Sequence, residues 1–372
     1  MKENSRCVNK SHTPALDPDA ELTDSGQGMS RRRLLEIMGI GTAGLAGSGL
    51  LAALGPASPS AAATETPSTS KNHSEVYAMV AYVTANPWWG NLRLGGEAAA
   101  KFLGVGFSFT GPSTYDVAGQ VSAIEQTAST RPAGMIVPTS IASAITPAID
   151  SVTANGIPVV TVDADSPASK RLSFIGTDAI ELGELMGAML VKGTGGKANI
   201  GIETVPGQIN LEQRFTGVKN AFKGHPGMKI IATANNNGDT STTATTAAAM
   251  LEAHPDMDAL LCLNATSDGI ITALKETNRV GKVKAVVSGV DGPTVAGIED
   301  GTLLGSMAQR TYMEAYLAVM FLYMVKHATP YEQLWTKHGI SMLPPTVDTG
   351  TVAITKENAS AYTELIKRYN YA

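Results

Sequence analysis

The stretch EVYAMVAYVTANPWWG, residues 75–90, joins a short apolar run to the start of a helical pattern. Residues 76–84 have the length and composition of a buried strand, and Asn86, Trp88 and Trp89 follow it directly. In an open parallel sheet, ligands bind beyond the carboxyl ends of the strands, where the strand order reverses. An amide and two large flat rings at such a place predict one wall of a site for something small, polar and partly flat.

From residue 75 onward, short apolar runs alternate with amphipathic stretches of helical length. The first series predicts strands at 76–84, 105–110, 133–138 and 157–162, with helices at 89–103, 116–130 and 141–155. After residue 178 the pattern starts again, with strands at 198–203, 228–234, 259–263, 283–290 and 303–308 and helices at 180–191, 211–223, 240–253, 268–277, 294–300 and 312–325. Such βα alternation predicts an α/β protein of two doubly wound, Rossmann-like parallel-sheet lobes with a crevice between their strand ends.

The first 63 residues have the pattern of an export signal. A polar segment is followed by SRRRLL at 30–35, a glycine-rich apolar run at 37–54 and the small residues 61–63. This is the three-part plan of a secretory signal, and its paired arginines resemble the twin-arginine signal that exports folded proteins. We expect cleavage near Ala63, a disordered lead over 64–74 and a protein free in a Gram-negative periplasm. Retention of the apolar run as a membrane anchor is the alternative.

Composition and charge narrow the class of protein. The 372 residues are enough for two domains, and 43% apolar with 16% charged residues is typical of a folded chain. The net charge of -5, with no basic block beyond the N-terminus, argues against a nucleic-acid partner. Cys7 precedes the expected cleavage site and Cys262 lies in the apolar run ALLCL, so we expect no disulfide and an inert core thiol.

The sequence contains none of the common catalytic or nucleotide-binding motifs. No GxGxxG fingerprint follows a strand, and the Walker, HExxH and GxSxG motifs are missing. The six histidines are scattered without metal-ligand spacing. We therefore expect a protein that is not an enzyme and needs neither a cofactor nor a metal.

Polar side chains come directly after the apolar runs of both lobes. They are Asn86, Asp163, Asp165, Asn264, Asp291 and Gln309, with Arg214 at the start of the helix after the 198–203 strand. Carboxylates accept hydrogen bonds, arginine donates in a fixed fork and amides do both, while a flat ring packs on sugar C–H groups. The set favours a sugar or polyol ligand. Each residue also has a structural alternative: a helix cap for the aspartates and Asn264, the core for a tryptophan, and solvent for Arg214.

Six stretches of the sequence together carry a family resemblance. They are NPWWG at 86–90, GIPVVTVDADSPASKRLSFIGTD at 156–178, GQINLEQRFTGVKNAF at 207–222, LCLNATSDGIITAL at 261–274, VSGVDG at 287–292 and GSMAQ at 305–309. In this order they resemble the type I periplasmic sugar-binding proteins of ABC transporters, the ribose-binding-protein family. The resemblance covers nearly all of residues 74–372.

The family resemblance implies the ligand-binding residues and the partners. The implied ligand residues are Asn86, Trp88 or Trp89, Asp163, Asp165, Asn210, Arg214, Asn264, Asp291 and Gln309. It implies a monomer, three chain crossings between the lobes, and a closed form that docks an ABC permease in the inner membrane. The first lobe would comprise 75–176 and 310–338, and the second lobe 177–309 and 339–372.

The chain also departs from the family pattern. Residues 235–239 lack the aromatic that covers ribose from the second lobe, so we expect stacking from one side only, with either Trp88 or Trp89 against the ligand. Two alternative functions remain. Asp163 and Asp165 would serve as the carboxylate pair of a secreted sugar-active enzyme, and a sensor or chemotaxis receptor would use the same cleft.

Overall fold

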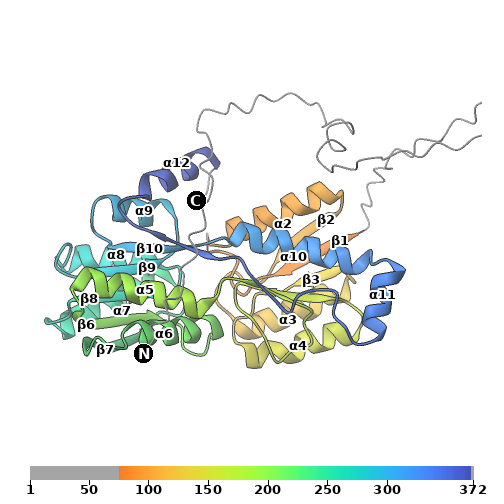
Figure 1. Cartoon of the computed structure of the whole chain (residues 1–372), viewed down its shortest axis with the longest axis horizontal. Helices are drawn as coiled ribbons and strands as arrows, with labels where there is room; N and C mark the ends of the chain where they lie inside the picture. The colour runs from red at the N-terminus through yellow and green to blue at the C-terminus, as the bar shows by residue number, and fades with distance from the viewer. Residues whose placement is uncertain (1–74, 87, 370–372) are drawn as a thin grey trace, which may run out of the picture. The chain divides into compact units, whose positions relative to one another are not determined.

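The structure, a computed structural model, describes residues 75–86 and 88–369 (Figure 1). The predicted signal segment and lead lie outside the described residues. Among the residues described, no helix combines the length and the apolar composition needed to cross a bilayer.

The first lobe is built on a six-stranded sheet in the order β11-β5-β4-β3-β1-β2, with parallel pairing throughout. Its strands are β1 (Val76–Val80), β2 (Gly106–Thr110), β3 (Gly134–Ile136), β4 (Val159–Val162), β5 (Phe174–Gly176) and β11 (Thr346–Asp348). Its helices are α2 (Trp89–Leu103), α3 (Val117–Ser129), α4 (Ala142–Ala154), α10 (Thr311–Lys326) and α11 (Pro330–Lys337). Strands β3 and β4 are buried along their whole length, as expected for parallel strands covered on both faces by helices.

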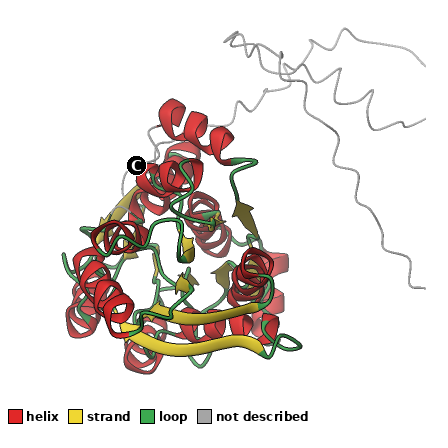
Figure 2. Ribbon diagram, turned by 90° about the vertical axis from the view of Figure 1, so that its left-hand side faces the viewer, coloured by secondary structure: helices red, strands yellow, loops and turns green. Residues whose placement is uncertain are grey.

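The second lobe repeats this plan with the sheet order β12-β10-β9-β8-β6-β7. Its strands are β6 (Lys197–Thr204), β7 (Gly227–Asn235), β8 (Ala259–Cys262), β9 (Lys284–Ser288), β10 (Gly305–Gln309) and β12 (Thr351–Ile354), the last antiparallel to β10. Its helices are α5 (Ala179–Thr194), α6 (Ile209–Ala221), α7 (Thr240–Ala253), α8 (Ser267–Glu276), α9 (Gly292–Glu299) and α12 (Ala359–Tyr369). Figure 2 shows the helices surrounding the strands. The two α/β lobes predicted from the sequence are therefore present.

In each sheet the first strand of the lobe lies between two others, so the chain runs outward from it in both directions. β1 pairs with β2 on one side and β3 on the other, and β6 pairs with β7 and β8 in the same way. Such a reversal leaves a crevice beyond the carboxyl end of the central strand, which is where ligands bind in open α/β sheets. The segments that leave β1 and β6 are therefore placed at the two crevices.

The chain passes between the lobes three times, at residues 177–178, at Arg310 and at residues 349–350. Strand β11 comes directly before the third passage and pairs with β5 of the first sheet. This pairing corrects the predicted boundary at residues 338–339, because Thr346–Asp348 belong to the first lobe. The first and third passages are tied together, since the Asp178 amide donates to Asp348 Oδ1 over 3.1 Å.

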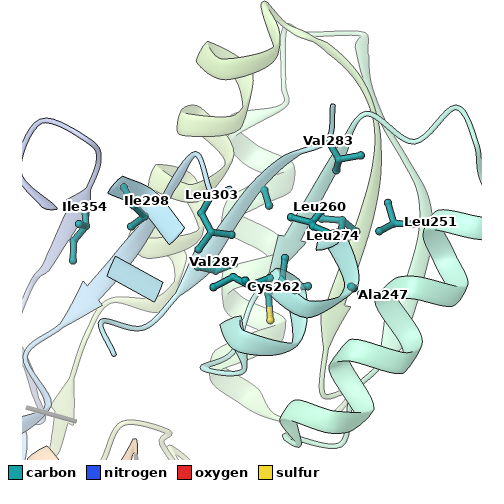
Figure 3. Close-up of a cluster of buried hydrophobic side chains, with 14 of the residues drawn as sticks. Ala247, Leu251, Leu260, Cys262, Leu274, Val283, Val287, Ile298, Leu303 and Ile354 are labelled. Atoms are coloured by element: carbon teal, nitrogen blue, oxygen red, sulfur yellow. The ribbon is translucent and has the colours of Figure 1, made fainter. Parts of the chain in front are cut away.

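Each lobe has a core of aliphatic side chains between its sheet and its helices. Figure 3 shows part of the second-lobe core, in which Cys262 lies among Leu260, Val287 and Leu274. Cys262 has no exposed surface, and burial raises the pKa of its thiol to about 11. The thiol is therefore protonated near neutral pH and unreactive as a nucleophile.

Close helix packing through glycine fixes the helix that follows β6. A Cβ atom on Gly183 of α5 would lie 2.0 Å from the Arg214 carbonyl oxygen, and one on Gly217 of α6 would lie 2.1 Å from the Ile180 carbonyl oxygen. Only glycine at these positions lets α5 and α6 approach so closely. The contact holds the backbone of Arg214 in place below the crevice.

Candidate functional site

A pocket lies between the two lobes, at the carboxyl ends of their central strands. It contains about 490 Å³ of space that no protein atom fills, part of it open to solvent. The lining residues are Tyr82, Val83, Asn86, Trp88, Trp89, Tyr115 and Asp163 from the first lobe and Gln208, Asn210, Leu211, Arg214, Gly238, Asn264, Ala265 and Gln309 from the second. The pocket thus gathers most of the polar residues that the sequence placed at strand ends.

Aromatic side chains from the first lobe form one side of the pocket. Trp89 is 2% exposed and packs edge-on against Tyr82, with ring centroids 5.0 Å apart and an interplanar angle of 90°. Trp88 is half-buried, and Asn86 Oδ1 accepts a hydrogen bond from its amide over 2.9 Å. Both tryptophans line the pocket, but Trp88 keeps more accessible surface for a ligand.

Arg214 connects the ends of two strands on the floor of the second lobe. It is 3% exposed, and its Nη1 and Nη2 donate to the Leu263 carbonyl over 2.7 Å and to Gln309 Oε1 over 3.0 Å. Its Nε is buried and has no hydrogen-bond partner among the described residues. The alternative of a solvated arginine is therefore wrong. A buried, charged N–H group of this pocket-lining residue therefore has no protein acceptor among the described residues.

Asp163 supplies the buried carboxylate of the pocket. It is 5% exposed, and its φ of 59° lies in the left-handed region, which asparagine and aspartate tolerate better than most residues. Burial raises the pKa of Asp163 to about 6, against the opposing effects of the Arg214 charge and the Tyr82 hydroxyl. Asp163 is therefore mostly an anion at neutral pH and becomes neutral in mildly acidic solution.

One hydrogen bond links the lobes at the pocket. Gln208 Nε2 donates to the Tyr82 hydroxyl over 2.9 Å, and that hydroxyl lies 3.5 Å from Asp163 Oδ2, to which it donates. The chain from Gln208 through Tyr82 to Asp163 couples the position of the second lobe to the carboxylate of the first.

A buried amide pair orients Asn264. Asn236 Nδ2 donates to Asn264 Oδ1 over 2.8 Å, and Asn264 Nδ2 donates to Asn236 Oδ1 over 3.0 Å. Asn236 has no exposed surface and does not line the pocket, whereas Asn264 does. Since the Asn264 oxygen is already used, its second Nδ2–H is the group left to donate to a ligand.

We expect Asn236→Ala to weaken ligand binding about tenfold and to lower the free energy of unfolding by about 1–3 kcal/mol, because both amide groups of Asn264 lose a buried partner. Isothermal titration and urea unfolding measure the two effects. Asn155→Ala, at an exposed position of the first lobe, is the matched control and should leave the ligand affinity unchanged. Unchanged affinity in Asn236→Ala would show that Asn264 does not depend on this pair.

Two of the predicted site residues lie elsewhere. Asp165 accepts from Arg171 Nε over 2.5 Å and from Arg171 Nη2 over 2.6 Å, and it does not line the pocket. Asp291 caps α9 by accepting from the Thr294 amide over 2.7 Å. Asp291 lines a neighbouring hollow that shares Asn86, Trp88, Ala265 and Gln309 with the pocket. Asp291 thus has the helix-cap role that was its structural alternative, whereas Asp165 forms an ion pair that the sequence did not predict.

Three pocket residues with a polar side-chain group were missed from the sequence: Tyr82, Tyr115 and Gln208. Both tyrosines follow strands of the first lobe, the same placement that marked Asn86, but an aromatic there is more often part of the core. Gln208 lies directly before α6, two residues from Asn210, so its place at the carboxyl end of β6 was the available signal.

The described residues contain no group of three or more His, Cys, Asp or Glu side chains placed to hold a metal ion. The buried charges of the pocket, Asp163 and Arg214, lie on opposite lobes and compensate each other electrostatically. This arrangement suits a neutral, hydroxyl-rich ligand.

The chain is similar to known sugar-binding proteins in sequence and in fold. A family model described as the periplasmic binding protein domain matches residues 77–328. The ribose import binding protein of Bacillus subtilis is 27% identical over 256 residues, which are 68% of this chain and 82% of that protein. A glucose-galactose binding protein from Geobacillus stearothermophilus has a TM-score of 0.70 at 26% identity, covering 76% of this chain and 98% of the other. An ABC transporter solute-binding protein from Burkholderia graminis, solved with D-arabinose, has a TM-score of 0.72 at 25% identity, covering 78% of this chain and 98% of the other.

Proposed function

Because the chain belongs to the periplasmic binding protein domain family, we propose that it binds a monosaccharide or small polyol reversibly in the pocket between its lobes. The observation that supports this most directly is the set of unused hydrogen-bonding groups around the pocket. Arg214 Nε has no protein acceptor, and the amide nitrogen of Gln309 is left to donate because its oxygen accepts from Arg214. The carboxylate of Asp163, which accepts from the Tyr82 hydroxyl, can accept a further hydrogen bond from a ligand. A sugar hydroxyl both donates and accepts, so one ring can satisfy groups of both kinds.

The ligand would favour a closed arrangement of the lobes, because its contacts come from both sides of the pocket. Asp163 and Trp88 belong to the first lobe, while Arg214 and Gln309 belong to the second. In the proposed cycle the protein is exported by the twin-arginine route, cleaved near Ala63 and free as a monomer in the periplasm. The closed form then delivers the sugar to an ABC permease.

The placement of Asp165 argues against the sugar-active enzyme. Asp165 is bound by Arg171 away from the pocket, so the carboxylate pair that a glycosidase would require is not assembled there. The relatives named above are likewise described as binding or import proteins.

A thermal-shift screen tests the proposed function. Pentoses, hexoses, deoxysugars and polyols are added to the full-length protein, and the melting temperature is recorded for each. A ligand at 100 times its dissociation constant should add about 2.7 kcal/mol of stability. Trp88→Ala tests whether the ligand binds in this pocket. It removes the half-buried ring that lines the pocket, so the sugar should raise the melting temperature less than in the wild type. If none of these compounds raises the melting temperature, the proposed function is wrong.

A further inference from the structure

Gly238 of the second lobe faces the ring of Tyr115 of the first lobe. Gly238 lines the pocket there with a φ of 67°, a left-handed conformation that suits glycine. The ring of Tyr115 occupies the space in front of it. Its Cδ2 atom lies 3.8 Å from the point where a Cβ atom on Gly238 would be. The Tyr115 ring and Gly238 thus lie close together in the pocket that both residues line, and the expectation of stacking from one side only stays a prediction.

Tyr115 is held in this place by its backbone and by both cores. The loop before it is bound to the end of β1: the Thr84 amide donates to the Pro112 carbonyl over 2.8 Å and the Ala85 amide to the Ser113 carbonyl over 3.2 Å. The Tyr115 ring packs edge-on against Tyr82, with centroids 5.5 Å apart and an interplanar angle of 74°. It also packs against the hydrophobic cores of the first and the second lobe. Its position is thus fixed without a ligand.

The hydroxyl of Tyr115 is the exception in this well-packed environment. It is buried, and no described residue forms a hydrogen bond with it. A buried hydroxyl without a partner is unfavourable, and in a native structure it calls for an explanation such as a functional role, strain or a bound water or ion. Tyr82, its neighbour, differs because its hydroxyl is bonded to Gln208 and Asp163.

We propose that Tyr115 forms the second wall of the sugar pocket and that its hydroxyl recognises one hydroxyl group of the ligand. This inference rests on the proposed function and narrows it. The pocket would distinguish a sugar carrying a hydroxyl at that ring position from its deoxy analogue, because only the hydroxyl satisfies the buried phenol oxygen.

The test is Tyr115→Phe, assayed by isothermal titration with D-ribose, D-arabinose, D-xylose, D-allose, D-glucose and D-galactose. The sugar that the wild type binds most tightly is then assayed again with each of its monodeoxy derivatives. We expect the variant to melt at the wild-type temperature or above, because it removes an unpaired buried group. Its affinity for the parent sugar should fall about tenfold, and for one monodeoxy derivative the variant and the wild type should bind equally.

Two tyrosine variants serve as comparisons. Tyr82→Phe removes a hydroxyl that already has protein partners, so it should lower the melting temperature of the ligand-free protein. Tyr312→Phe changes a tyrosine that is 37% exposed and should alter neither the melting temperature nor the sugar affinity. The inference about Tyr115 is wrong if Tyr115→Phe binds every parent sugar as tightly as the wild type does. It is also wrong if the variant loses affinity equally for every monodeoxy derivative. Either result leaves the proposed function standing. A wild type that binds none of the sugars would overturn the proposed function and this inference with it.

Discussion

Arg214→Lys is expected to leave the protein folded and to weaken sugar binding about 100-fold. The guanidinium holds the Leu263 carbonyl and Gln309 Oε1 with two separate nitrogens, and its Nε remains for the ligand. A lysine ammonium is a single point of charge and cannot keep this planar geometry. Hydrogen bonds to charged groups contribute about 1.5–3 kcal/mol each, and about 2.7 kcal/mol corresponds to 100-fold in affinity. Isothermal titration with the tightest-binding sugar measures the loss.

Lysine is the informative substitution because alanine would confound binding with folding. Arg214 lies close to the buried carboxyls of Asp163 and Glu314, and its charge opposes the rise that burial causes in both of their pKa values. Removing the charge would leave these groups uncompensated, at a cost of about 3–5 kcal/mol. The exposed Arg93→Lys on α2 is the matched control and should keep full affinity. Wild-type affinity in Arg214→Lys would place the ligand away from the guanidinium.

Sugar affinity should fall about tenfold between pH 7 and pH 5, and Asp163→Asn should remove this dependence. The pKa of Asp163 is about 6, so the carboxylate that accepts from a sugar hydroxyl becomes protonated across this range. Asparagine suits this position because it tolerates the left-handed backbone and keeps an acceptor oxygen, whereas alanine would be strained. Isothermal titration at pH 5, 6 and 7 with both proteins gives the comparison.

The stability of the ligand-free protein should change in the opposite direction. The folded-state pKa of Asp163 is raised above its ordinary value of 3.8, so the folded state binds a proton more readily than the unfolded state. The contribution of Asp163 to stability is therefore complete below about pH 3.8 and is lost as pH rises through about 6. Burial also raises the pKa of Glu203 to about 7, which adds a change of the same sign. The difference in unfolding free energy between the wild type and Asp163→Asn, measured across this pH range, gives the contribution of Asp163. If that difference does not vary with pH, the pKa of Asp163 is not raised in the folded protein.

The longer elements of the fold could be predicted because their apolar periodicity is local. The helices predicted at residues 89–103 and 240–253 coincide with α2 and α7. The strands β5 and β11 were missed because each has three residues and lies in a polar stretch, without the longer apolar run that marked the equally short β3. They form because each finds a partner far along the chain, and this pairing also moved the lobe boundary.

The site was predictable to the extent that it follows from topology. Asn86, Asp163, Arg214, Asn264 and Gln309 reach one pocket because the strands of each lobe end at the same edge. The direction of an individual side chain does not follow from topology, and Asp165 turned out to bind Arg171. Tyr82 and Tyr115 were missed because their apposition depends on hydrogen bonds between the loops after β1 and β2, which no sequence spacing reveals.

The return of the chain to the first lobe sets the order in which that lobe can be completed during synthesis. Its core contains Ala315, Val319 and Leu322 of α10 as well as Leu343, and its sheet ends with β11. A ribosome-bound chain that has released only β1 to β5 thus lacks a helix and an edge strand of its own first lobe. The second lobe likewise lacks an edge strand and a helix until β12 and α12 have been made. Neither lobe is therefore complete until nearly the whole chain has been released, so the two lobes finish folding together.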